Sequence, residues 1–73
     1  MRDLIAVFKS RKDAMQFAMM MNKSRVRVRM ISTPSSIGSS CDLSVRFPRV
    51  AFSIAERVLS YAEFQTFKGF FEL

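Results

Sequence analysis

Cys41 is the side chain of this sequence best suited to covalent chemistry. It is the only cysteine among 73 residues, and it ends the serine-rich segment Ser32-Thr33-Pro34-Ser35-Ser36-Ile37-Gly38-Ser39-Ser40-Cys41. A cysteine reacts as its thiolate, and cations, hydroxyls or backbone amides beside the sulfur stabilise that anion. The hydroxyls of Ser36, Ser39 and Ser40 are placed to do this, so the segment predicts a reactive cysteine.

The residue types around Cys41 exclude several reaction classes. The chain has no histidine, which rules out a Cys-His dyad, a Ser-His-Asp triad and a histidine-ligated metal. One cysteine forms neither an intrachain disulfide nor a zinc site of the usual kind. Two glycines in total provide no glycine-rich phosphate loop. We therefore expect a non-hydrolytic carrier without cofactor or metal, in preference to a stand-alone enzyme.

The first half of the chain predicts a strand and a helix ahead of this segment. The continuous apolar run Leu4–Phe8 is typical of a central strand covered on both faces. Ser10 and Asp13 have the spacing of a capping box, in which Asp13 reaches back to the cap. Apolar residues at helical spacing then predict a helix from about Arg11 to Met21.

The remaining elements complete a known arrangement. From Arg25 the period switches to two and predicts a second strand that buries Val26, Val28 and Met30. Leu43–Phe47 reads as a third strand, and Pro48 suits the first turn of a second helix. A last strand is expected from about Phe67 to Glu72. Strand-helix-strand-strand-helix-strand is the ferredoxin-like, split βαβ order, so residues 1–73 are expected to form one α+β domain with a four-stranded antiparallel sheet and two helices on one face.

The connection between the second and third strands is longer than such a hairpin needs, and long loops are often functional. Pro34 cannot donate a hydrogen bond to a neighbouring strand, and Gly38 permits a backbone conformation closed to other residues.

In this topology the loop shares one end of the sheet with the start of the first helix. Cys41 is therefore expected near Arg11 and Lys12, with Arg46 as a further candidate cation. The positive helix end and these side chains would favour a thiolate.

At Ser32-Thr33-Pro34 through Ile37, at Ser39-Ser40-Cys41 and at Arg46-Phe47, the sequence resembles the Se/S carrier-like family of short bacterial proteins. The specific part of the resemblance runs from Thr33 to Phe47. It implies that Cys41 carries sulfur or selenium as a persulfide or selenosulfide between donor and acceptor proteins. Ser35-Ser36 and Asp42 depart from the family pattern, which has an Arg-Glu pair and a glycine there. The loop thus lacks one cation, and a carboxylate beside the sulfur would disfavour the thiolate.

A small RNA-binding domain is an alternative, because the net charge of +6 favours an anionic partner. Arg25, Arg27 and Arg29 would form a phosphate-binding stripe, although a solvated edge-strand face is the favoured explanation of these three residues. The third strand offers one aromatic residue, Phe47, and lacks the pattern of RNA-binding sheets of this fold.

A dimeric interaction module without chemistry is a third possibility. Period two places Phe70 on the sheet face that the helices leave uncovered, together with Ile5 or Val7. Exposed apolar patches commonly mark interfaces, so a homodimer or partner contact through this face is expected.

The sequence indicates a cytoplasmic protein. Ala14–Met21 is too short for a membrane span and contains Gln16. The residues before Leu4 lack the pattern of a signal peptide, and a lone cysteine fits a reducing compartment.

Overall fold

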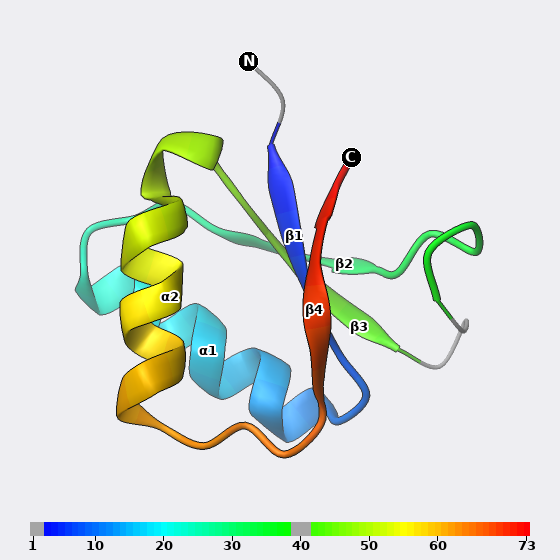
Figure 1. Ribbon diagram of the computed structural model, residues 1–73, viewed down its shortest axis with the longest axis horizontal. Coiled ribbons are helices and arrows are strands. Elements are labelled where there is room, and N and C mark those ends of the chain that lie inside the picture. Colours follow the sequence, from blue (N-terminus) through cyan, green and yellow to red (C-terminus); the bar gives the residue numbers. More distant parts are fainter. Residues whose placement is uncertain (1–2, 39–41) are drawn as a thin grey trace.

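A four-stranded antiparallel sheet carries both helices on one of its faces (Figure 1). The computed structural model describes residues 3–38 and 42–73. Its elements are β1 (Leu4–Phe8), α1 (Arg11–Lys23), β2 (Arg29–Ser32), β3 (Leu43–Phe47), a short 3-10 turn (Arg49–Ala51), α2 (Phe52–Tyr61) and β4 (Phe67–Glu72). The strands lie side by side in the order β2-β3-β1-β4, which confirms the predicted ferredoxin-like arrangement. Neither described helix is long and apolar enough to cross a membrane.

Strand β1 is the centre of the sheet and is buried along its whole length. It pairs with β3 on one side and with β4 on the other. Leu4, Ala6 and Phe8 belong to the core beneath the helices. Seven phenylalanine rings form a connected network in and around that core: Phe8, Phe17, Phe47, Phe52, Phe64, Phe67 and Phe70. Aromatic packing therefore holds the two layers together.

Helix α1 begins where the sequence predicts, but its cap differs from a capping box. The Oγ of Ser10 accepts a hydrogen bond from the Asp13 N–H at 3.4 Å. The Ser10 N–H donates to Thr66 Oγ1 at 3.1 Å, and Thr66 donates through both N–H and hydroxyl to Asp13 Oδ2, at 3.1 and 2.6 Å. The prediction that Asp13 reaches back to Ser10 is thus wrong, because Thr66 is interposed. This network joins the start of α1 to the segment that leads into β4.

Strand β2 begins at Arg29, four residues later than predicted. Helix α1 continues to Lys23, and the chain then turns at Arg25, whose φ is +65°. The Val26 N–H donates back to Met21 O at 3.0 Å, which closes the helix end. Val26 is buried as predicted and Val28 packs against the core, but Met30 is 37% exposed, so the prediction that Met30 is buried is wrong.

A β-bulge in β4 changes which aromatic residue meets the helices. Gly69 pairs with Val7 while Phe67 pairs with Phe8, so Lys68 is the extra residue. Phe70 consequently packs against Phe52 of α2, with ring centroids 4.9 Å apart. The prediction that Phe70 lies on the uncovered face is wrong, because simple alternation does not survive the bulge.

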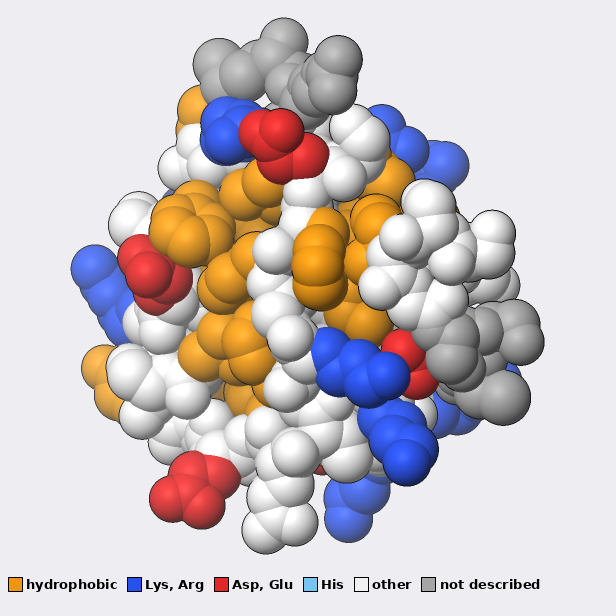
Figure 2. All heavy atoms as spheres, turned by 45° about the vertical axis from the view of Figure 1, so that its right-hand side comes forward, with side chains coloured by type: hydrophobic (Ala, Val, Ile, Leu, Met, Phe, Trp, Pro, Cys, Tyr) orange, Lys and Arg blue, Asp and Glu red, His pale blue; other side chains and the backbone are white. Residues whose placement is uncertain are grey.

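Phe71 takes that place on the open face of the sheet. It is paired with Ile5 and is 36% exposed, whereas Ile5 and Val7 are 0% and 1% exposed. Gly69 has a φ of +141°, and a Cβ there would lie 3.5 Å from the Phe71 ring. In the space-filling view, hydrophobic side chains lie on both sides of a pale stripe of backbone and polar atoms (Figure 2). The open face therefore retains some apolar surface, and the homodimer remains a prediction.

Candidate functional site

The loop that contains Cys41 connects β2 to β3 at the end of the sheet where α1 starts. Cys41, Ser39 and Ser40 lie outside the described residues, so the described site consists of the loop's two flanks. Leu43 pairs with Ser32 of β2 and with Phe8 of β1, and Arg11 and Leu43 line the same surface hollow. The loop ends and the helix start therefore share one end of the sheet, as the topology predicts.

The first half of the loop folds as a turn at Pro34. The carbonyl oxygen of Pro34 accepts hydrogen bonds from the Ile37 N–H at 2.9 Å and the Gly38 N–H at 3.1 Å. Pro34 is half-buried, and Ser36 is exposed at the surface of the turn. Pro34 thus shapes the described part of the loop, and a role for Ser36 stays a prediction.

Thr33, at the start of the loop, forms hydrogen bonds with Asp42 and Ser44, where the chain comes back into the sheet. Its N–H donates to Asp42 O at 3.4 Å, and its hydroxyl shares a 2.7 Å hydrogen bond with the hydroxyl of buried Ser44. These contacts hold the two described ends of the loop together.

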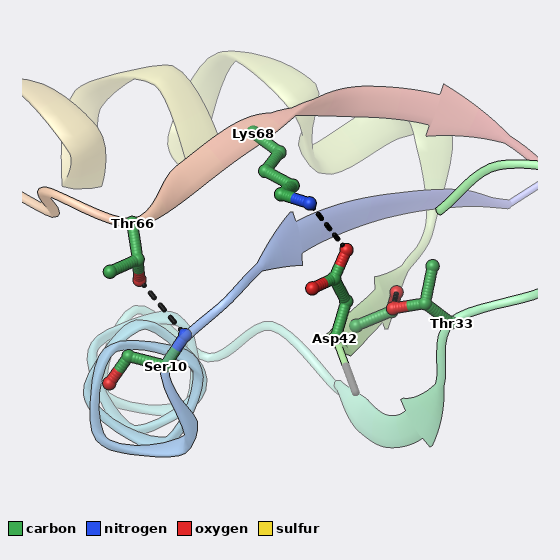
Figure 3. A network of polar contacts seen from close by, with 6 residues as sticks. Ser10, Thr33, Asp42, Thr66 and Lys68 are labelled. Carbon is green, nitrogen blue, oxygen red and sulfur yellow. Dashed lines mark hydrogen bonds and ion pairs between the residues drawn. The ribbon is translucent and has the colours of Figure 1, made fainter. Parts of the chain in front are cut away.

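Asp42 is buried and compensated by Lys68. Its side chain is 2% exposed, and Oδ2 accepts a hydrogen bond from Lys68 Nζ at 2.8 Å (Figure 3). The sequence places this carboxylate next to Cys41, where it is expected to disfavour the thiolate. The structure pairs it with the lysine of β4, and its effect on Cys41 stays a prediction.

Position 38 favours glycine because a side chain there would have too little room, and not because of its backbone conformation. A Cβ at this position would lie 2.9 Å from Asp42 Oδ2 and 3.1 Å from Thr33 Cγ2. Among the glycines in the described chain, only Gly69 has a positive φ. The expected conformational role of Gly38 is therefore wrong; the glycine lets the turn pass close to the buried carboxylate.

The candidate cations are distributed over the molecule. Arg11 and Lys12 are exposed in the first turn of α1, and their proximity to Cys41 stays a prediction. Arg46 lies four strand residues beyond Asp42, about 13 Å along β3, where its Nε donates to Asp3 Oδ2 at 2.8 Å. The structure does not bring Arg46 together with Arg11.

Lys68 is the cation that sequence reasoning missed. It lies 26 residues after Asp42, and the bulge turns it towards that residue. The predicted topology could have indicated Lys68, because β3 and β4 both begin at the end of the sheet that carries the loop.

Comparison with known proteins identifies the family. The family model described as "Putative Se/S carrier protein-like" matches residues 3–70. No significant match was found among curated proteins or among solved structures. The match runs from before β1 into β4 and includes the whole serine-rich loop. On this evidence the chain belongs to the Se/S carrier protein-like family.

Proposed function

We propose that this protein carries sulfur or selenium on Cys41, as a persulfide or selenosulfide, from a donor protein to an acceptor protein. The family match over residues 3–70 is the observation that supports this most. Cys41 is the only thiol in the chain, so a chalcogen atom held by a cysteine must be held there. We place this exchange in the reducing cytoplasm.

The uptake step is a transfer of one sulfur atom without net oxidation. The Cys41 thiolate attacks the outer sulfur of a donor persulfide, and a new S–S bond forms on Cys41. The donor's own S–S bond breaks, and its electron pair leaves with the donor thiolate. Delivery repeats the exchange with an acceptor thiolate as the attacking group. Selenium would follow the same path as the outer atom.

The described surroundings of the loop are compatible with this step. Lys68 compensates the charge of Asp42, the residue next to Cys41. Arg11 lies at the same end of the sheet, where the N-terminus of α1 adds partial positive charge. Thiolate exchange needs no general base once the thiol is ionised, which agrees with a chain without histidine.

Intact-mass measurement tests the proposal directly. After incubation with a cysteine desulfurase and cysteine, without reductant, we expect the protein to gain the mass of one sulfur atom. Cys41→Ser should gain none, whereas Ser53→Ala, which removes an exposed hydroxyl on α2 outside the loop, should keep the gain. The absence of an adduct on the unaltered protein, or an equal adduct on Cys41→Ser, would contradict the proposal. Selenocysteine with a selenocysteine lyase, as the alternative donor pair, distinguishes the chalcogen.

We further propose that the donor protein docks beside the loop, in the hollow lined by Arg11, Met15, Met30 and Leu43. Met15 is 52% exposed and Met30 37% exposed, and Leu43 is two residues from Cys41. The apolar lining and the single cation Arg11 suit an apolar donor segment with an acidic residue beside it. Methionine side chains adapt to different surfaces, which suits a carrier that meets both a donor and an acceptor.

Met15→Asp is expected to slow sulfur uptake from the desulfurase by about tenfold, the effect of losing roughly 1.4 kcal/mol of contact energy. Met19→Asp is the matched control, because Met19 is equally exposed one turn further along α1 and does not line the hollow. The reaction of Cys41 with a small aromatic disulfide should be the same in both variants. Equal slowing by both substitutions would exclude this docking position while leaving the carrier function intact.

A further inference from the structure

Three arginines line a second hollow, of about 370 Å³, near the end of β3 opposite the Cys41 loop. Arg29 is the first residue of β2, Arg27 lies two residues before it, and Arg46 comes from β3. Asp3, Phe47 and Pro48 contribute to the same walls. Arg29 and Arg46 are direct cross-strand partners. Like charges directly opposite each other destabilise a strand pair, so the fold alone gives no reason for this arrangement.

The charges of the hollow do not balance. Asp3 is its only acidic residue, and its Oδ2 accepts a hydrogen bond from Arg46 Nε at 2.8 Å. Within residues 3–38 and 42–73, neither Arg27 nor Arg29 takes part in an ion pair. Three cations and one anion leave the hollow with a net charge of +2. An anion of matching charge would relieve the repulsion.

We propose that this hollow binds a phosphate group. The planar guanidinium of arginine matches the geometry of phosphate oxygens with paired N–H donors. A phosphate monoester carries a charge of about −2 near neutral pH, which equals the excess charge of the hollow. The Asp3 carboxylate accepts a hydrogen bond from Arg46 Nε. The two terminal nitrogens of the Arg46 guanidinium can therefore donate to the ligand. The proposal is independent of sulfur carriage, because the site and the cysteine loop lie at different ends of β3.

The same phosphate chemistry has two sources, a small phosphorylated molecule or the backbone of RNA. Titration of the ¹⁵N-labelled protein with inorganic phosphate, pyrophosphate or a single-stranded RNA oligonucleotide distinguishes them, with ionic strength held constant by chloride. We expect saturable shifts of the Arg29 and Arg46 amide signals. Saturation by inorganic phosphate or pyrophosphate indicates a small-molecule site, and saturation by RNA alone indicates a backbone site.

Arg29→Gln is expected to weaken the binding at least tenfold, because it removes a charge-assisted hydrogen bond to the anion. Arg57→Gln is the matched control, because it removes the same charge from an exposed position on α2 outside the hollow. Unchanged spectra of both free variants establish that they fold. The proposal is overturned if no probe saturates, or if both variants lose affinity equally, which would reflect net charge alone.

Discussion

Phe8→Ala is expected to remove about 3–5 kcal/mol from the free energy of unfolding, the usual cost of truncating a buried aromatic side chain. Phe8 is 0% exposed at the end of the central strand. Its ring centroid lies 5.3 Å from those of Phe17 and Phe67 and 5.6 Å from that of Phe64. One side chain thus joins α1, β1, β4 and the segment before β4. A domain of this length has a total stability of roughly 4–11 kcal/mol, so the variant should be largely unfolded or close to it.

Urea denaturation followed by far-UV circular dichroism measures this loss. Tyr61→Ala is the control, because Tyr61 is also aromatic but is 77% exposed; its effect should stay within about 0.5 kcal/mol. If the two variants had similar midpoints, Phe8 would not be the centre of the aromatic network.

Lys68→Met is expected to cost about 1–3 kcal/mol, because it removes the Lys68 ammonium from its ion pair with the buried Asp42 carboxylate. Removing one partner of a fully buried ion pair costs about 3–5 kcal/mol. The smaller value applies here because the Lys68 side chain is 44% exposed and only Asp42 is buried. The substitution retains a side chain of similar length, so the change concerns charge more than packing.

A double-mutant cycle isolates this interaction. Lys68→Met should cost less in the presence of Asp42→Asn than in the unaltered protein, because a neutral amide needs no cation. Additive effects in the cycle would show that the pair is not coupled. In the same series, the rate of reaction of Cys41 with a small disulfide reports whether the pair also affects the loop.

Elements that depend on local pattern could be predicted from the sequence. The bounds of β1 and β3 follow from an unbroken apolar run and a clean alternation. Ser10 marks the start of α1, and Pro48 precedes the turn that leads into α2. In each case the deciding residues lie within a few positions of one another, so no distant contact intervenes.

The errors arose where residues far apart in the chain meet. The face on which Phe70 lies depends on a bulge that only the pairing of β4 with β1 produces. The position of Asp13 is decided by Thr66, which lies 53 residues away. The pairing of Asp42 was missed because its partner, Lys68, belongs to a different strand. The pattern of residues along the chain predicts the strands and the helix around this site, but it does not predict which distant residues contact one another.

The central position of β1 has a consequence for synthesis on the ribosome. Leu4 pairs with Phe47 of β3 on one side and with Glu72 of β4 on the other. Strand β1 therefore completes its pairing only after β4 has been synthesised. Until β4 has left the exit tunnel, an apolar five-residue strand has one open hydrogen-bonding edge. Contacts of such long sequence separation slow folding, and nascent chains in this state are open to wrong pairing or to chaperones that recognise extended apolar segments.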